Sequence, residues 1–189
     1  MGRAVCIINN IEYMHTNVDG EVLRNVMRRV PTPVTVVTAQ GPEEARGITI
    51  GSFVSVSLDP PLITFNVNRK ARMHPIITEA DRYVVHVLRE EQAHLSELFA
   101  RADLSGEEQF ASIAFTPAPE DGLPILNDVL AVLYCRPYAV YEAGDHSILV
   151  GQVEAVDLGA PGKPVLYYNR AYYAVGKAVV PVAEAEERS

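Results

Sequence analysis

The chain has 189 residues, of which 48% are hydrophobic and 21% are charged, and its formal net charge is −8 at pH 7. This composition is typical of one globular domain, and it excludes long disorder and a membrane-spanning apolar run. The negative charge repels phosphate backbones and anionic lipid, so neither nucleic acid nor a membrane is an expected partner. We expect a cytoplasmic protein with an N-terminal extension at 1–18, a single domain at 19–182 and a frayed tail at 183–189.

The first predicted elements are a short helix and a series of antiparallel strands. From Asp19 onward, apolar residues recur with helical spacing until Pro31 ends the helix. The β-branched run at 34–38 and the stretch at 47–58 predict two strands separated by a turn-rich segment. Three further elements are expected before residue 90, namely strands at 62–68 and 83–88 and a helix whose first residue is Pro75.

The second half of the chain predicts one more helix and several more strands. The helix carries Leu95, Leu98 and Phe99 on one face, and a polar connection with one helical turn around 106–111 follows it. Two or three strands with a turn at 143–146 come next, and a last strand is expected at 165–175. Short strands without regular βαβ alternation predict a mainly β fold with peripheral helices, arranged as a closed or nearly closed antiparallel barrel.

Neither metal nor disulfide chemistry has support in the sequence. Cys6 and Cys135 form no Cys-x-x-Cys pair, so a disulfide framework and a zinc ribbon are not expected. His86 and His94 have no acidic or histidine partner at the spacing of metal ligands. We therefore expect all four to be structural residues and expect no metal site.

The predicted strand at 47–58 has two unlike faces, because successive side chains of a strand point in opposite directions. One face is apolar enough for the core and consists of Ile48, Ile50, Val54, Val56 and Leu58. The other is small and rich in hydroxyl groups, and it consists of Thr49, Gly51, Ser55 and Ser57 around Phe53. A flat polar ligand fits this second face at the glycine, and the wet side of an ordinary strand explains it equally well.

A basic loop at 68–75 leads directly into the helix predicted at Pro75. The segment NRKARMHP places Arg69, Lys70, Arg72 and His74 beside the positive end of the helix, which favours a phosphate group. A solvated basic loop that pairs with nearby carboxylates is the alternative.

Two further features lie near strand ends. His146 follows Gly144 and Asp145 in a turn, where its imidazole meets solvent and any ligand at the rim of the sheet; an exposed histidine without a role is the alternative. Four tyrosines of the last predicted strand either stack on an aromatic cofactor or fill a core or an interface, and they are Tyr167, Tyr168, Tyr172 and Tyr173.

The common nucleotide-binding and hydrolase motifs are absent. The sequence contains no GxGxxG after a strand, no GxxxxGK[ST], no HExxH and no GxSxG. Any nucleotide cofactor is therefore expected to bind to something other than a Rossmann fold or a P-loop.

Several segments together resemble the flavin reductase family. They are, in chain order, RGITIGSFVSVSLDPPLITFNVNRKARMHPII, YVVHVLREEQAHLSELFA, GDHSILVGQVEAV and PVLYYNRAYY, and the similarity runs from about Leu23 to Tyr173. The resemblance implies an antiparallel Greek-key split β-barrel of the FMN-binding type. It also implies the reduction of FMN or FAD by NADH or NADPH, a partner monooxygenase that receives the reduced flavin, and a homodimer with the site near the subunit interface.

The resemblance also implies which residues bind the two nucleotides. The flavin residues are Arg46, Gly47, Ile48, Thr49, Gly51, Ser52, Asn66, Val67, Asn68, Arg72, Met73, Phe99 and Ala100. The residues that face the nicotinamide nucleotide are His146, Tyr167, Tyr168, Asn169 and Arg170. Backbone N–H groups at 47–52 are the expected donors to the flavin. Hydride transfer does not clearly require a side-chain acid or base, so no catalytic residue is required, and His146 is named only as a candidate.

The sequence departs from the family pattern at three positions. Ala71 and Met73 stand where the family commonly has hydroxyl residues that help to bind phosphate, and Pro33 stands where it usually has glycine. The first two changes weaken the expected hold on the flavin, which suits a reductase that releases its product. A flavin-binding electron carrier, or a flavoprotein that uses the fold for another reaction, is the alternative function.

Overall fold

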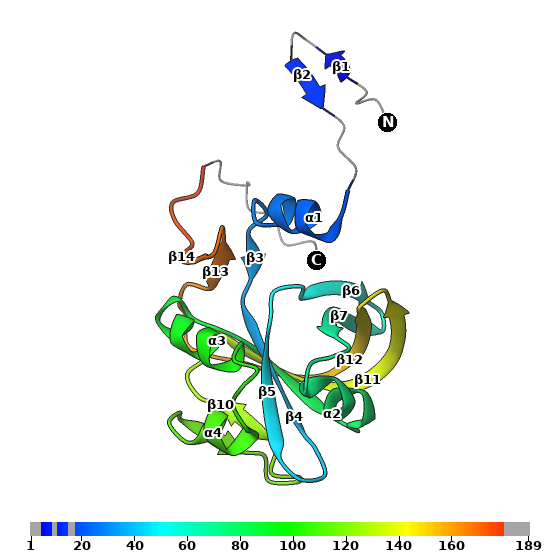
Figure 1. The fold of residues 1–189 in the computed structure, drawn as a ribbon. Helices are drawn as coiled ribbons and strands as arrows, with labels where there is room; N and C mark the ends of the chain where they lie inside the picture. The colour runs from blue at the N-terminus through cyan, green and yellow to red at the C-terminus, as the bar shows by residue number, and fades with distance from the viewer. Residues whose placement is uncertain (1–4, 9–10, 15–17, 180–189) are drawn as a thin grey trace.

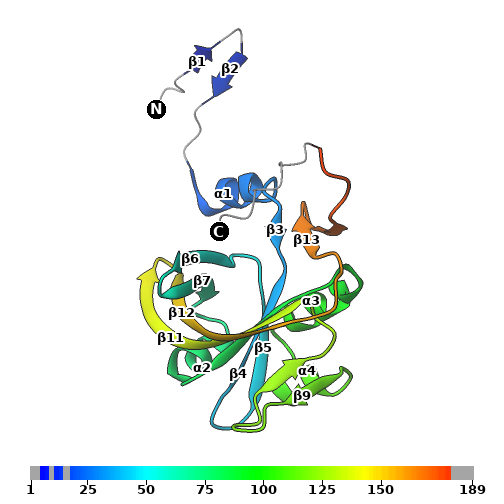
Figure 2. The ribbon, with the colours of Figure 1, turned by 180° about the vertical axis from the view of Figure 1, so that it is seen from behind.

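The computed structural model describes residues 5–8, 11–14 and 18–179. Its largest element is a sheet of seven antiparallel strands: β4 (Thr35–Gln40), β5 (Ala45–Ile50), β6 (Val54–Leu58), β7 (Pro61–Asn68), β8 (Tyr83–Val87), β11 (Ala131–Ala143) and β12 (His146–Leu158). The strand order is β5-β4-β8-β11-β12-β7-β6, and the sheet curls strongly between its two edges (Figures 1 and 2). The prediction of a mainly β, antiparallel fold with peripheral helices is confirmed.

Three small sheets accompany the large one. They pair β1 (Val5–Ile8) with β2 (Ile11–Met14), β9 (Phe115–Pro117) with β10 (Pro124–Leu126), and β13 (Val165–Tyr168) with both β14 (Ala171–Ala174) and β3 (Thr32–Pro33). The single strand expected at 165–175 is therefore wrong, because the chain reverses within it. Asn169 and Arg170 adopt φ angles of 48° and 65°, and two consecutive left-handed residues make the tight turn of a hairpin.

Helices occur where the sequence predicts them, with shifted ends. They are α1 (Gly20–Met27), α2 (Met73–Glu79), the 3-10 helix η1 (Glu90–Gln92), α3 (Ala93–Phe99) and α4 (Gly106–Phe110). The Asp19 carboxylate caps α1 by accepting the N–H groups of Glu21 and Val22. Helix α2 begins at Met73 instead of Pro75, so Pro75 is the third residue of the helix. A proline is tolerated there because the N–H groups of the first turn have no partner within the helix.

The stretch at 47–58 forms two strands instead of one. Strand β5 ends at Ile50, the chain turns through 51–53, and β6 then pairs with β7 at the far edge of the sheet. An irregular register between Ser55 and Ser57 breaks the alternation of faces. The expected core positions of the second half are consequently wrong: Val54, Val56 and Leu58 are 55%, 53% and 89% exposed.

The core lies inside the curled sheet and beneath α2 and α3. One cluster of buried side chains surrounds Phe65, Tyr83 and Ile77, and the other surrounds Val36 and Phe99. Between residues 18 and 179 there is no helix that is both long and apolar enough to cross a membrane.

The residues expected to be structural are placed as follows. Cys135 and His86 are buried, and both ring nitrogens of His86 bond to backbone atoms, as expected of structural residues. The ring of His94 lies on the surface, with Nδ1 3.2 Å from the Glu91 carbonyl oxygen, and the Cys6 side chain lies outside the described residues. The described ranges contain no cluster of three or more potential metal ligands.

Candidate active site

The site forms along the free edge of β5. Strand β5 pairs with β4 on one side only, and its other edge faces α3 and α4. Three hollows follow one another along this edge, and neighbouring hollows share Ala100 at one junction and Gly51 at the other. A continuous groove therefore runs past residues 47–52, the segment that the sequence singles out.

The middle hollow has a volume of about 350 Å³ and a mixed polar and aromatic lining. Its walls come from Thr32, Pro33, Val34, Thr49, Ile50, Gly51, Ser96, Ala100, Tyr167 and Tyr172. The Thr49 hydroxyl donates to the Ser96 carbonyl oxygen at 2.6 Å, and the Tyr172 hydroxyl donates to the Ser96 hydroxyl at 2.9 Å. A Cβ at Gly51 would lie 3.1 Å from the Thr32 hydroxyl, so a side chain there would narrow the groove.

The second hollow is smaller, about 140 Å³, and three guanidinium groups surround it. Arg46 is buried, and it bonds the Glu44 carboxylate at 2.5 Å and the Leu104 carbonyl oxygen at 2.6 Å. Arg101 pairs with Asp103 at 2.7 Å. The exposed Arg72 makes only a long bond of 3.3 Å to the Leu104 carbonyl, so it keeps the most capacity to bind an anion.

Phe99 and Gln109 hold Gly47 between them. A Cβ at Gly47 would overlap the Phe99 ring, so only glycine lets α3 pack this closely on β5. The Gly47 N–H donates to Gln109 Oε1 at 3.1 Å, and Gln109 Nε2 donates to the Gly47 carbonyl oxygen at 3.2 Å. The expectation that backbone N–H groups of 47–52 are free to bind a ligand is therefore wrong at Gly47. Sequence reasoning missed Gln109, because only a predicted helical turn marks its position.

Glu44 joins the same region to α4. Its carboxylate accepts from Arg46 and from the Gly106 N–H at 2.6 Å, which fixes the start of α4 against β5. The bond from Arg46 is the main cause that holds the pKa of Glu44 below its ordinary value. The carboxylate therefore stays charged and continues to hold Arg46 in place.

The third and largest hollow, about 720 Å³, lies beneath α1. Ser52, Asn66 and His146 line it together, and the Ser52 hydroxyl oxygen accepts the Asn66 N–H at 2.8 Å. His146 Nδ1 lies 2.7 Å from the Asp145 carboxylate, and this bond lowers the pKa of Asp145. His146 and Tyr167 therefore line different hollows, which meet at Gly51.

The remaining residues implied by the resemblance divide into three groups. Ile48, Met73, Phe99 and Ala100 line the hollow around Arg72. Val67 points into the core and is 1% exposed, while Asn68 uses its side-chain oxygen to accept the Lys70 N–H at 2.8 Å. The last group, Tyr168, Asn169 and Arg170, forms the tip of the β13–β14 hairpin and lines none of the three hollows.

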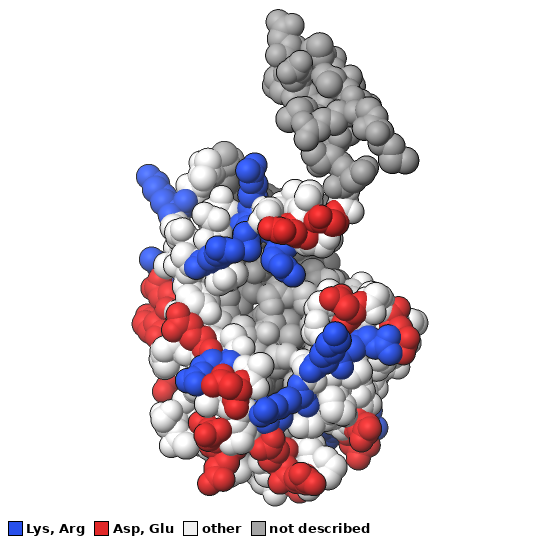
Figure 3. Space-filling view, in the orientation of Figure 1, with Lys and Arg blue, Asp and Glu red and all other residues white. Residues whose placement is uncertain are grey.

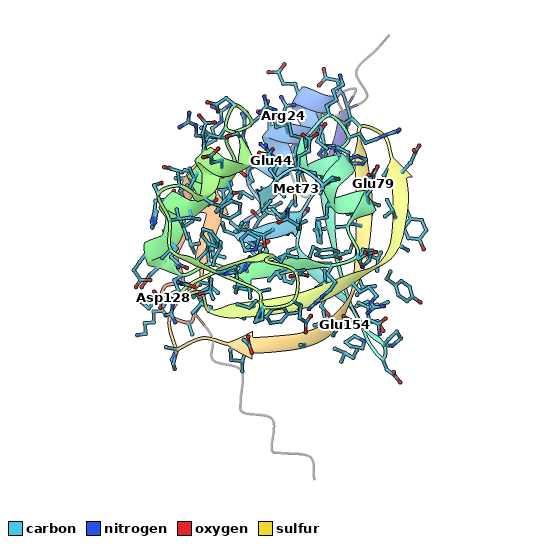
Figure 4. The ribbon with its side chains drawn as sticks, turned by 90° about the horizontal axis from the view of Figure 1, so that it is seen from below. Arg24, Glu44, Met73, Glu79, Asp128 and Glu154 are labelled. Atoms are coloured by element: carbon cyan, nitrogen blue, oxygen red, sulfur yellow. The ribbon has the colours of Figure 1, made fainter. Side chains whose placement is uncertain are left out.

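Charge is distributed unevenly around the groove. Figure 3 shows Lys and Arg side chains on both sides of the concave region beneath α1, whereas Asp and Glu gather mainly on the outer and lower surface. Seen from below in Figure 4, Met73 lies toward the centre of the molecule, inside the strongly curved strands. An anionic ligand is therefore attracted to the groove even though the net charge is −8.

Comparison with known proteins gives consistent matches. Residues 27–176 match a family described as "Flavin reductase like domain". The reductase component of 4-hydroxyphenylacetate 3-monooxygenase from Thermus thermophilus is 40% identical over 152 residues, which cover 80% of this chain and 94% of that protein. An FMN reductase (NADH) from Agrobacterium fabrum is 39% identical over 130 residues, 69% of this chain and 72% of that protein.

A solved structure shares the fold. The NADH:FAD oxidoreductase of Streptomyces globisporus, solved in complex with NAD and FAD fragments, has a TM-score of 0.78 and 32% sequence identity. The match covers 88% of this chain and 100% of that one.

Proposed function

Because this chain belongs to the flavin reductase like domain family, we propose that it reduces FMN or FAD with NADH or NADPH and supplies the reduced flavin to a partner monooxygenase. The observation that carries the proposal is the groove along the free edge of β5. It has an available cation, Arg72, at one end and an aromatic and imidazole lining at the other. Such a groove fits an elongated ligand with an anionic tail and a flat ring.

The residues present fit a flavin. Arg72 would bind the phosphate, and the polar bed at Thr49 and Ser96 would lie against the ring system in the middle hollow. Gly51 leaves space for close approach to the backbone. Ala71 adds no hydroxyl group at the phosphate end, so the hold on the flavin depends strongly on Arg72.

The chain contributes orientation more than acid–base chemistry. A bound flavin supplies the capacity to accept a hydride from the nicotinamide ring. Productive transfer requires the donor and acceptor atoms at roughly 3 to 3.5 Å with aligned orbitals, so the residues that fix the two rings determine the rate. Tyr167 lines the middle hollow, and His146 lines the hollow that joins it at Gly51, so these residues would position the nicotinamide nucleotide.

We also propose that the chain acts as a homodimer. The edge strand β6 exposes Val54, Val56 and Leu58, and Tyr141 on β11 is 59% exposed. Helix α1 has no buried residue, although Leu23 and Met27 give it an apolar face. Apolar side chains on an edge strand and a helix are typical of surfaces that another protein surface covers. Leu23 and Met27 also line the hollow beneath α1, so a second copy packed against this helix would enclose that end of the groove.

The proposed partner is a monooxygenase, and the proposed compartment is the cytoplasm, where NADH and NADPH are available. The relative from Thermus thermophilus is itself named as the reductase component of a two-component enzyme. Oxidation of NADH or NADPH, measured with and without added FMN or FAD, tests the activity. Consumption that requires the flavin supports the reductase, whereas flavin binding without consumption supports the electron carrier.

A further inference from the structure

A fourth hollow begins where the basic hollow ends. It has a volume of about 360 Å³ and lies between the β4–β5 loop and α2, with Gly41, Pro42, Glu43, Glu44, Arg72, Pro75, Ile76 and Glu79 as its lining. Arg72 belongs to the lining of both hollows. A ligand whose phosphate binds Arg72 from the groove can therefore continue into this second space.

The lining changes character beyond Arg72. Pro42, Pro75 and Ile76 provide apolar walls, and the remaining polar side chains are carboxylates. Glu44 is occupied by Arg46 and the Gly106 N–H, whereas Glu43 and Glu79 form no ion pair and no side-chain hydrogen bond within residues 18–179. In Figure 4, Glu44 and Glu79 are labelled on opposite sides of Met73. The space repels an additional anion and offers acceptors to a neutral group that carries N–H and O–H donors.

The volume limits what can bind there. Small-molecule sites have volumes of about 300 to 1,000 Å³, and 360 Å³ lies at the lower end of this range, which suits a group of nucleoside size. A nucleoside has the required properties, because it is flat, uncharged and rich in donors at its amino group and ribose hydroxyls.

We propose that this hollow binds the adenosine of FAD, with Arg72 on the pyrophosphate between the two halves of the dinucleotide. The inference rests on the proposed function, because it takes the groove along β5 as the flavin site. Its consequence is a preference for FAD over FMN. Two additional hydrogen bonds, even at the low end of the ordinary net range for each, correspond to at least about fivefold tighter binding of FAD.

Equilibrium binding of FAD, FMN and riboflavin, followed by flavin fluorescence, tests the proposal without turnover. The test variant is Glu43→Ala/Glu79→Ala. The control is Glu91→Ala/Glu97→Ala, which removes two exposed carboxylates that line none of these four hollows. FMN and FAD carry similar phosphate charge, so a general electrostatic effect cancels in the ratio of their dissociation constants.

We expect the unaltered protein and the control to bind FAD at least fivefold more tightly than FMN, and the test variant to reduce this ratio to within about twofold of unity. A ratio near unity in the unaltered protein, or an unchanged ratio in the test variant, would overturn the proposal. NADH also carries an adenosine. If the hollow binds that adenosine instead, the test variant should raise the KM for NADH at saturating FMN and leave the ratio of the FAD and FMN dissociation constants unchanged, which would overturn the proposal. Absence of NADH and NADPH oxidation with every flavin would instead overturn the proposed function.

Discussion

The side-chain amide of Gln109 bonds both backbone groups of Gly47, accepting its N–H at 3.1 Å and donating to its carbonyl oxygen at 3.2 Å. Gln109 is 1% exposed, and its amide replaces the neighbouring strand that the edge of β5 lacks at this point. The segment 47–52 that forms the bed of the groove is therefore held from α4 as well as from β4.

Replacement of Gln109 with leucine should destabilise both the fold and the site. It leaves two backbone groups of Gly47 without partners, at a cost of about 1 to 3 kcal/mol for each group that stays buried. We expect a lower midpoint of thermal unfolding and weaker flavin binding. Gln40→Leu, at an exposed position at the end of β4 whose amide donates only to the neighbouring Gly41 carbonyl oxygen, should have a much smaller effect on both. Equal effects of the two variants would show that the bonds to Gly47 have no special role.

The Arg72→Ala variant tests the phosphate end of the groove. A charge-assisted hydrogen bond to phosphate contributes roughly 1.5 to 3 kcal/mol, so FMN binding should weaken by about ten- to a hundredfold. Riboflavin has no phosphate, and its affinity should hardly change. Arg136→Ala removes an arginine that pairs with Glu154 outside the groove and serves as the control. Equal losses of FMN and riboflavin affinity would mean that Arg72 supports the fold or the ring instead.

The His146→Ala variant tests the donor side. His146 lines the hollow beneath α1 and is held by Asp145, so its removal should raise the KM for NADH or NADPH about fivefold to thirtyfold, as expected for a contact of about 1 to 2 kcal/mol. Flavin affinity should stay within about twofold. A steep fall in kcat with an unchanged KM for the nicotinamide nucleotide would instead identify an acid–base catalyst.

His86 makes stability depend on pH. Burial lowers its pKa from 6.5 to about 4, while its bond to the Val36 carbonyl oxygen opposes the shift. Below pH 6.5 the His86 side chain binds a proton in the unfolded chain but not in the folded chain. The free energy of unfolding therefore falls as the pH drops toward 4, by at most about 1.4 kcal/mol per pH unit.

The measurement is urea unfolding at pH 7 and at pH 5. The free energy of unfolding should fall more in the unaltered protein than in His86→Gln, which cannot titrate at this position. Equal losses in the two proteins would show that His86 contributes nothing to the pH dependence.

Local sequence signals predicted most of the fold. The β-branched residues of β4, β7 and β8 and the apolar spacing of α1 and α3 were sufficient, because each element is consistent with its own periodicity. The β13–β14 hairpin was missed because its turn residues, Asn169 and Arg170, lack the glycine that usually marks such a turn.

The errors at β6 and in the site arise from contacts between distant segments. Val54 and Val56 alternate like core residues, but β6 lies at the edge of the sheet and both side chains are exposed. The periodicity of a strand does not determine its place in the strand order. Gln109 reaches Gly47 across 62 positions of the chain, and no local pattern marks such a pair. The sequence therefore identified the segment 47–52 but could not reveal how it is held.

Catalytic reduction of free flavin is tested by counting turnovers. NADH or NADPH is mixed with a large excess of FMN or FAD under anaerobic conditions, and reduced flavin is measured against the amount of protein. A reductase should convert many flavin molecules per protein chain, with one nicotinamide nucleotide oxidised for each. Reduction that stops at one flavin per chain, or that does not occur with either nucleotide, would contradict catalytic reduction.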